Sequence, residues 1–301
     1  MRKVNNSVKG HAAALTTITI WGTTFVSTKV LLIDFEPIEI LFYRFIIGLI
    51  ILLIAYPHRL KGTGKKREFM FMGAGLCGVT MYYMLQNIAL TYTTASNVGV
   101  ITSVGPIFTV LLANWLLDES KLKASFFIGF FVAITGISLI SFSGITALRL
   151  NPLGDLLALM AAVFWAIYSI LVRKISEYGY DTIQVTRRIF FYGLVFMTPA
   201  LFVFRFNFGI ERFSQPANIL NILFLGICAS ALCFVTWNSA VKFLGAVKTS
   251  LYIYLVPVIT VAASVIILNE KITIVMALGI VLTLAGLFLS EKKPKPTRSE
   301  L

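Results

Sequence analysis

Ten stretches of roughly 20 mostly apolar residues follow one another along the chain, and each has the length that a helix needs to cross a lipid bilayer. Of the 301 residues, 58% are hydrophobic and 13% are charged, whereas an average soluble domain has about 25% charged residues. Because a helix satisfies its own backbone hydrogen bonds inside lipid, the sequence predicts an all-α membrane protein. The ten predicted spans are Ala12–Leu32, Ile38–Tyr56, Phe69–Ala89, Ser96–Leu117, Ser125–Ser143, Leu153–Val172, Ile183–Phe204, Ile219–Val241, Thr249–Leu268 and Thr273–Ser290.

The basic residues predict how these spans are oriented. With the N-terminus placed in the cytoplasm, 18 of the 26 Lys and Arg residues fall in cytoplasmic segments, 4 in external segments and the rest within or at the ends of spans. Positive residues accumulate on the cytoplasmic side of membranes, so both termini are predicted to be cytoplasmic. The net charge of +13 is therefore expected to face membrane lipids, and nucleic acid is not an expected partner.

One segment with a central proline occurs twice, at a constant offset of 151 residues. Its copies are Ala95–Glu119 and Ala246–Glu270, so Pro106 matches Pro257. A proline inside a helix removes a backbone hydrogen bond and kinks the helix. In lipid such a break is tolerated where protein or a water-filled cavity surrounds it, so two matching kinks predict a paired gating device that lines a shared interior. For either proline alone, ordinary packing is the alternative, because proline is common in membrane helices.

The correspondence extends over the whole chain and predicts two repeats. Trp21 matches Trp165 and Arg44 matches Arg188 at an offset of 144 residues. The predicted domains are a first repeat at residues 10–145, a second repeat at 152–290 and a disordered cytoplasmic tail at 291–301. Because each repeat has five spans, the second must cross the membrane in the opposite sense. Transporters use such inverted repeats to form inward-open and outward-open states around a site at the middle of the bilayer.

Several short motifs, taken together, resemble the EamA family of the drug/metabolite transporter (DMT) superfamily. They are WGTTF followed by Lys29, the segment from Pro37 to Arg44 and Phe45, the ASN and GPIF motifs around the fourth span with the closing Glu119, and ALGIVLTLAGLFL near the end of the second half. The resemblance covers roughly Gly10 to Ser290. It implies ten helices in two EamA repeats, a central substrate cavity and the export of small metabolites, often amino acids or related compounds. One departure is that Asp181 stands where a second-half counterpart of Pro37 would be.

Polar and aromatic side chains within the spans are the candidate substrate contacts. An amide buried without a partner costs roughly 2–7 kcal/mol, so Asn87 and Asn238 must face protein or water. For these amides, the alternative to substrate contact is an interhelical hydrogen bond. For tryptophan and tyrosine, the alternative is the aromatic belt at the membrane interface. The candidate substrate-binding residues are Trp21, Tyr83, Gln86, Asn87, Ser103, Trp165, Tyr168, Trp237, Asn238 and Tyr254.

Two matching arginines, Arg44 and Arg188, lie within spans and are candidate gating residues together with the two prolines. A charge inside a span is costly and usually functional. Their symmetric placement predicts one arginine near each end of the transport pathway. The alternative is that each lies near a helix end and either extends to the membrane interface or pairs with a nearby carboxylate, such as Glu39 or Asp181.

The sequence lacks the groups that a membrane-embedded catalytic centre or metal site would need. No acidic residue lies in the middle of a span, and the two histidines lie at the edges of apolar runs. We therefore expect neither cofactor nor metal, and no proton-exchanging carboxylate for cationic drugs. The prediction is a secondary transporter of the plasma membrane, monomeric or homodimeric, that exports a small metabolite by alternating access. The alternative is a proton-coupled multidrug transporter or a nucleotide-sugar or nucleoside transporter of the same superfamily; an enzyme or a channel fits less well.

Overall fold

Helices occupy every range in which the sequence predicts a membrane span. The computed structural model describes residues 2–92, 95–117, 124–142, 151–204, 206–268 and 273–291, and no strand occurs within them. The first-half elements are α1 (Arg2–Leu31), α2 (Pro37–Ala55), α3 (Lys65–Gly75), the π-helix η1 (Leu76–Met81), α4 (Tyr82–Tyr92), α5 (Ala95–Thr102), α6 (Gly105–Leu116) and α7 (Ala124–Phe142). The predicted tail from residue 292 and the paired Glu119 and Glu270 lie outside the described residues.

The second half repeats this succession with different interruptions. Its elements are α8 (Pro152–Ser176), α9 (Thr182–Val203), the 3-10 helix η2 (Ile210–Ser214), α10 (Pro216–Leu223), the π-helix η3 (Phe224–Leu232), α11 (Cys233–Leu244), α12 (Ala246–Ser250), the 3-10 helix η4 (Leu251–Tyr254), α13 (Leu255–Leu268) and α14 (Ile274–Glu291). Asn151 caps the start of α8, where its side chain accepts a hydrogen bond from the Gly154 N–H.

Five helical stretches of the described chain are long and apolar enough to cross a membrane. They are Pro37–Ala55, Val98–Leu116, Pro152–Ser176, Thr182–Val203 and Pro216–Leu244. Shorter apolar helices lie at Ala124–Ile140, Ala246–Ile259 and Ile274–Ser290. The fold is therefore that of an all-α, multi-pass membrane protein.

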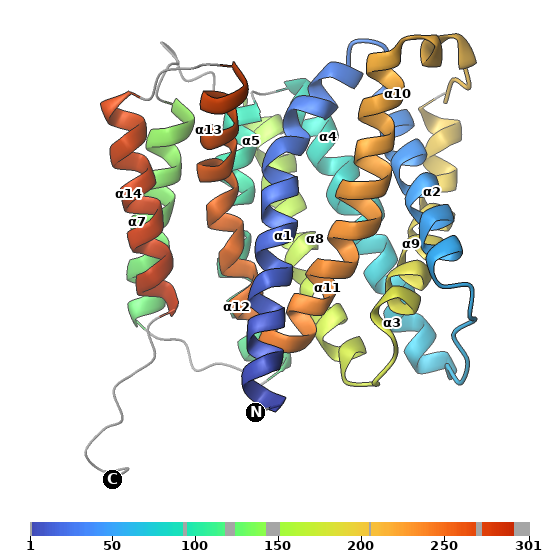
Figure 1. Ribbon diagram of the computed structural model, residues 1–301, viewed down its shortest axis with the longest axis horizontal. Helices are drawn as coiled ribbons and strands as arrows, with labels where there is room; N and C mark the ends of the chain where they lie inside the picture. Colours follow the sequence, from blue (N-terminus) through green and yellow to red (C-terminus); the bar gives the residue numbers. More distant parts are fainter. Residues whose placement is uncertain are drawn as a thin grey trace.

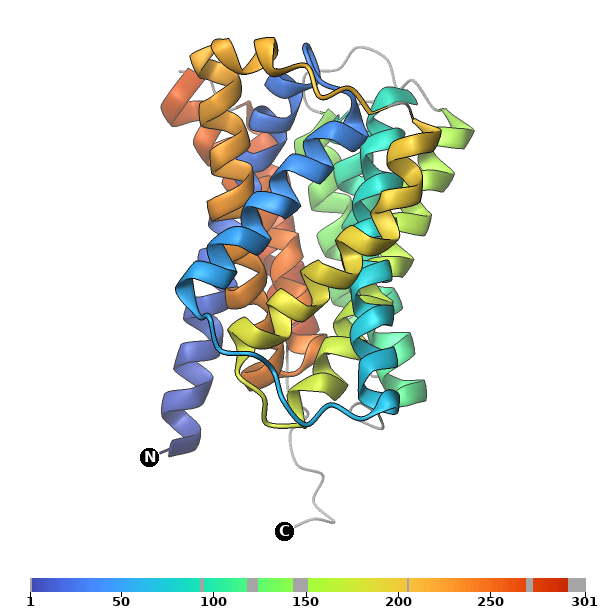
Figure 2. The ribbon, with the colours of Figure 1, turned by 90° about the vertical axis from the view of Figure 1, so that its right-hand side faces the viewer.

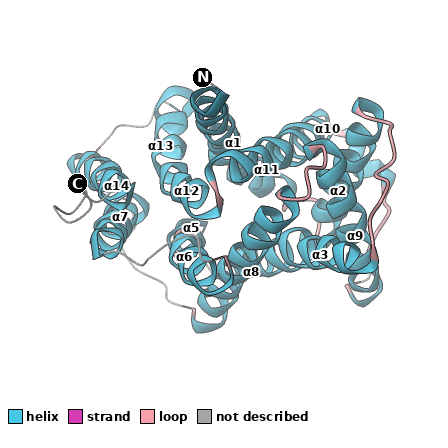
Figure 3. Cartoon of the chain, turned by 90° about the horizontal axis from the view of Figure 1, so that it is seen from below, coloured by secondary structure: helices cyan, strands magenta, loops and turns pink. Residues whose placement is uncertain are grey.

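The helices run side by side, and the start of α1 and the end of α14 lie at the same end of the molecule (Figure 1). Helices α2 and α9 pack against each other on the face shown in Figure 2. Viewed along the helices, α7 and α14 form a separate pair, with α5, α6, α12 and α13 between that pair and the remaining helices (Figure 3). The main hydrophobic core lies where α1, α2, α4, α8, α9 and α11 meet.

Glycines allow α7 and α14 to touch backbone to backbone. A Cβ atom on Gly136 would lie 2.5 Å from the carbonyl oxygen of Gly279, and one on Gly129 would lie 2.6 Å from that of Gly286. Distances this short leave no room for a side chain. The close contact between α7 and α14 therefore depends on these four glycines. The small residues follow the spacing that is typical of close helix pairs in membranes.

The two matching prolines stand just after interruptions of their helices. The sequence predicts a kinked but continuous helix at Pro106, whereas the structure ends α5 at Thr102 and starts α6 at Gly105. In the second half, the 3-10 helix η4 directly precedes the α13 segment that contains Pro257. A proline lacks an N–H and clashes with the carbonyl four residues earlier, which is why the α-helical pattern fails on its N-terminal side.

Candidate functional site

A cluster of aromatic side chains fills the region where helices of both halves converge. We call it the aromatic cluster, and its residues are Trp21, Phe45, Tyr82, Tyr83, Trp165, Tyr168, Phe190, Phe234 and Trp237. They come from α1, α2, α4, α8, α9 and α11. Ring centroids of Trp21 lie 5.3 Å from Trp165 and 5.2 Å from Trp237. These distances are typical of direct aromatic contacts.

Phe234, which matches Tyr83 at the offset of 151 residues but is not among the candidate substrate-binding residues, lies at the centre of the cluster. Its ring is 5.0 Å from Phe190, 5.7 Å from Phe45 and 6.0 Å from Trp165, measured between centroids. It is fully buried, as is Trp237, which lies three residues later on the same face of α11. That helical spacing from Trp237 and Asn238 is the signal by which Phe234 could have been found.

Asn238 lies beside the cluster and joins three helices. Its side-chain oxygen accepts a hydrogen bond of 2.6 Å from the Tyr168 hydroxyl of α8, and its amide nitrogen donates at 3.0 Å to the Thr186 hydroxyl of α9. All three side chains are at least 98% buried. The geometry therefore matches the interhelical hydrogen bond that the sequence leaves open for this amide.

The remaining polar candidates are placed in different surroundings. Asn87 is buried on α4, and its amide donates at 3.4 Å to the carbonyl of Pro37, while Gln86 is buried next to it. The Ser103 hydroxyl donates to the carbonyl of Gly99 within its own chain segment. Tyr254 is fully buried in a second apolar core that includes α6 and α7 residues, so it lies outside the aromatic cluster.

Arg44 contacts the aromatic cluster directly. Its Nε donates a hydrogen bond of 2.9 Å to the Ser230 hydroxyl of η3, and its guanidinium carbon lies 4.5 Å from the centroid of the Tyr83 ring. Its exposure is only 4%, so it does not extend to the membrane interface. The suggested pairing with Glu39 is not present, because Glu39 binds a different arginine.

Glu39 is the centre of a polar network at the end of the molecule opposite to the termini. Its carboxylate accepts a hydrogen bond of 2.6 Å from Arg212 and one of 2.9 Å from the backbone N–H of Asn207. It also accepts from the N–H of Glu36 at the start of α2. With only 1% of its surface exposed, Glu39 forms an ion pair that fastens the η2 region to α2.

A second network lies at the end that carries the termini, and it contains the other predicted arginine. Arg188 of α9 forms an ion pair of 2.7 Å with Glu68 of α3. Glu68 also accepts hydrogen bonds from the hydroxyls of Thr63 and Tyr192. Burial raises the pKa of Glu68, but these hydrogen bonds and the positive charge of Arg188 outweigh that effect and hold it below its ordinary value.

The neighbouring Arg187 strengthens this network through backbone acceptors. Its guanidinium donates to the carbonyls of Tyr56 and His58, in the chain that leaves α2. Asp181, the other suggested carboxylate partner, instead caps α9 by accepting from the N–H groups of Ile183 and Gln184. The sequence does not reveal the two partners of Arg187, because they lie 131 and 129 residues away along the chain.

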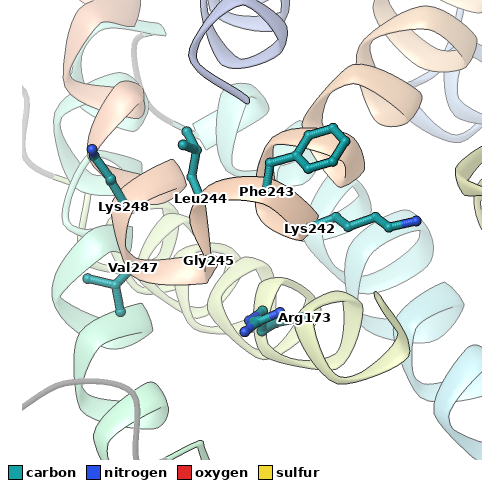
Figure 4. A pocket seen from close by; sticks show the side chains of 7 residues that line it. All are labelled: Arg173, Lys242, Phe243, Leu244, Gly245, Val247 and Lys248. Carbon is teal, nitrogen blue, oxygen red and sulfur yellow. The ribbon is translucent and has the colours of Figure 1, made fainter. Parts of the chain in front are cut away.

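A pocket of about 360 Å³ opens at the end that carries the termini, where α8 and α11 end and α12 begins (Figure 4). Gly245 makes the sharp turn there with a φ of 86°, a left-handed conformation that favours glycine. The pocket is lined by Arg173, Lys242, Phe243, Leu244, Gly245, Val247 and Lys248. Three of these side chains are basic, and none belongs to the aromatic cluster.

The chemistry of the site is that of binding. The described part of the chain contains no group of three or more His, Cys, Asp or Glu side chains that is placed to hold a metal ion. A small molecule that has both apolar and polar parts can bind to such a set of aromatic faces, hydroxyls, amides and a buried guanidinium.

Comparisons with known proteins give a matching family model, several relatives and a solved structure of the same fold. A model of the EamA-like transporter family matches residues 8–142 and 152–291. An uncharacterized transporter of Archaeoglobus fulgidus is 29% identical over 291 residues, which covers 95% of this chain and 98% of that protein. A probable terminal-alkyne amino-acid exporter of Streptantibioticus cattleyicolor is 25% identical over 289 residues, with coverage of 96% and 95%. A solved crystal structure shares the fold with a TM-score of 0.75 at 19% identity, covering 94% of this chain and 96% of its own.

Proposed function

Because the chain belongs to the EamA-like transporter family, we propose that it is a secondary transporter that exports a small metabolite from the cell by alternating access. The substrate class that we propose is an amino acid or a related compound. The observation that carries this proposal is the aromatic cluster, which is buried where helices of both halves converge and has amide and hydroxyl groups beside it. The printed name of the Streptantibioticus cattleyicolor relative supports the same class.

In the proposed architecture, ten helices cross the plasma membrane as two inverted repeats with both termini in the cytoplasm. The 18 to 4 distribution of basic residues supports this orientation. The common position of the start of α1 and the end of α14 is compatible with an even number of crossings (Figure 1). In this orientation, the Glu68 network and the basic pocket lie on the cytoplasmic side, and the Glu39 network lies on the external side.

The two polar networks serve as the gates in this proposal. The Glu39–Arg212 ion pair holds the external end closed, and the Glu68–Arg188 ion pair holds the cytoplasmic end closed. With both pairs formed and the aromatic cluster closely packed, the described conformation corresponds to an occluded state. Breaking one pair at a time would open the cluster to one side only, as alternating access requires. Pro106 and Pro257 supply the helix breaks about which α6 and α13 could move.

The alternative, a proton-coupled multidrug or a nucleotide-sugar or nucleoside transporter, makes a different prediction about coupling. Proton exchange with a cationic drug needs a carboxylate that is free to change its protonation inside the membrane. Glu39, the carboxylate that is buried among the described residues, is engaged with Arg212. We therefore favour facilitated diffusion or exchange of an uncharged or zwitterionic metabolite.

Counterflow in proteoliposomes tests the proposal. The purified protein is reconstituted, loaded with one unlabelled amino acid at a time, and assayed for uptake of the same labelled compound. We expect saturable uptake that is stimulated by internal substrate and does not depend on an imposed pH gradient. Uptake that does not saturate would indicate a channel, and strong dependence on the pH gradient would favour the proton-coupled alternative.

Tryptophan substitutions show whether the aromatic cluster is the binding site. We expect Trp165→Ala and Trp237→Ala to raise the half-saturating concentration at least tenfold, because each removes a large aromatic face. Trp115→Ala is the matched control, since Trp115 is 78% exposed near the end of α6. An equal effect of all three substitutions would argue against a site at the cluster.

A further inference from the structure

Arg44 differs from Arg187, Arg188 and Arg212 in how its charge is accommodated. Arg188 pairs with Glu68, Arg212 pairs with Glu39, and Arg187 donates to two backbone carbonyls. Arg44 is more deeply buried than these, at 4% exposure, yet no carboxylate of the described residues lies within ion-pair distance of it. Its hydrogen bond goes to the neutral hydroxyl of Ser230.

An arginine side chain in a protein carries its positive charge even when it is buried. Removing that charge from water is unfavourable unless an anion or several acceptors compensate for it. The ring faces of Tyr83 and Phe45, at 4.5 and 5.3 Å, supply part of this compensation but carry no negative charge. The site is therefore one that an anionic group would complete.

Trp237 provides a second and independent observation. Its indole Nε1–H is fully buried and has no hydrogen-bond partner among the described residues. By contrast, the indole of Trp21 donates to the carbonyl of Ala229, and the amide of Asn238 is used by Tyr168 and Thr186. A buried donor without an acceptor is unfavourable, so the cluster calls for a ligand that brings acceptor oxygens.

We propose that Arg44 receives the carboxylate of the transported compound while the aromatic cluster holds its apolar body. The substrate class is then the free organic carboxylic acids, amino acids among them, and excludes the corresponding amides and esters. This inference rests on the proposed transport function and narrows it. Ser230 acts as a positioning residue, because it accepts the hydrogen bond from Nε, and Nη1 and Nη2 are the donors that would bind a carboxylate through two parallel hydrogen bonds.

Matched acid and amide pairs test the proposal directly. The thermal unfolding of the purified full-length protein is measured with L-phenylalanine and L-phenylalaninamide, L-leucine and L-leucinamide, and phenylacetate and phenylacetamide. Counterflow of each stabilising compound is then measured in proteoliposomes. We expect at least one acid to stabilise the protein and to be transported, with an affinity at least tenfold higher than that of its amide.

Variants of Arg44 connect this preference to one side chain. Arg44→Gln should abolish the preference for the acid, and Arg44→Lys should reduce it, because lysine keeps the charge but lacks the two parallel donors. Ser230→Ala should weaken binding of the acid and leave that of the amide unchanged. If Arg44→Gln does not fold, the lysine and Ser230 variants still decide the question. Arg67→Gln is the matched control and should keep the acid preference, because Arg67 also contacts a tyrosine ring and a hydroxyl but is exposed and lies outside the aromatic cluster.

The possible outcomes separate the inference from the function on which it rests. Equal binding of acids and amides by the unaltered protein, or an unchanged preference in Arg44→Lys and Ser230→Ala, would overturn the role of Arg44 and leave the transporter intact. Counterflow of a permanently cationic compound but of none of the acids would overturn both this inference and the proposed substrate class.

Discussion

Asn238 is the residue at which helices α8, α9 and α11 are tied together. Its amide oxygen accepts a hydrogen bond of 2.6 Å from the Tyr168 hydroxyl, and its amide nitrogen donates one of 3.0 Å to the Thr186 hydroxyl. Leucine has the same branched arrangement of side-chain heavy atoms but would leave the Tyr168 hydroxyl buried without its acceptor. Because all of these groups are buried, losing this hydrogen bond should lower the stability of the folded protein.

We predict that Asn238→Leu lowers the free energy of unfolding by about 1–3 kcal/mol. The measurement is reversible unfolding in mixed detergent micelles. Asn221→Leu serves as the control, since the side chain of Asn221 donates to the carbonyl of Ala217 in its own helix and has no other hydrogen bond among the described residues. A loss of similar size in both variants would contradict the role of Asn238 as an interhelical link.

The lowered pKa of Glu68, at the proposed cytoplasmic gate, predicts that the stability of the folded protein depends on pH. Its pKa in the folded protein lies below the ordinary value of 4.5. A lowered pKa means that the ionised carboxylate stabilises the folded state above that value and that this contribution is lost as the pH falls through the folded-state pKa. The difference in stability between the protein and Glu68→Gln should therefore be constant at neutral pH and shrink below about pH 4.5.

Thermal unfolding from about pH 7 to about pH 3 measures this difference. Glu211→Gln is the comparison, because Glu211 is exposed and forms no ion pair among the described residues. A stability difference for Glu68→Gln that grows on acidification would contradict the assignment.

At the residue scale, the sequence identifies types of side chain better than it identifies partners. The positions of Trp165 and Trp237 deep within their spans indicate that they line the interior, and the structure brings both of them together with Trp21. The partner of Arg188 was not predictable, because Glu68 is 120 residues away and reaches it only through the packing of α3 on α9. Tyr254 resembles the other candidates in sequence but packs in a different core, since hydropathy does not tell which neighbours a helix face meets.

At the scale of elements, the contact between α7 and α14 depends on the absence of side chains. A Cβ atom on Gly136 would approach the Gly279 carbonyl and the Thr283 N–H to 2.5 Å. Backbone atoms cannot move aside as a flexible side chain can. Even a methyl group should therefore force the two helices apart.

We predict that Gly136→Ala destabilises the protein by about 1–3 kcal/mol, as overpacking generally does. Gly99→Ala is the matched control, because nothing lies within 4 Å of a Cβ there and the residue is in helix α5. That control should be neutral or slightly stabilising, since alanine favours the helix. Unfolding of both variants under the same conditions checks the contrast, and equal stabilities would show that the two helices can separate without cost.

The irregular helices show where sequence patterns stop being informative. The apolar runs predict the positions of the membrane spans, and the prolines predict kinks in the fourth and ninth of them. The π-helices η1 and η3 were not predicted, although Gly75, Cys77 and Gly226, Cys228 match at the offset of 151 residues. A π-helix keeps the composition of an α-helix and changes only which carbonyl each N–H reaches, so hydropathy does not reveal it.

At the scale of the whole molecule, the orientation in the membrane can be tested with single cysteines. In a background without Cys77, Cys228 and Cys233, we expect Lys61→Cys to be protected from a membrane-impermeant thiol reagent in intact cells. Gln215→Cys should react, because the loop before α10 is predicted to be external. Permeabilised cells, in which both should react, provide the control. The reverse pattern would invert the assignment of the two gates.

The buried charge of Arg44 also has an electrical consequence. With a simple monocarboxylate such as phenylacetate bound, the guanidinium and its ligand are together neutral, whereas the empty site, like the site with a zwitterionic amino acid, keeps one positive charge. Moving one elementary charge through the full membrane potential involves about 2.3 kcal/mol per 100 mV. An imposed potassium diffusion potential should therefore change the rate at which the unloaded carrier returns across the membrane. The same potential should leave one-for-one exchange of a simple monocarboxylate unaffected. The membrane voltage of a cell would then set how fast the cell loses the solute.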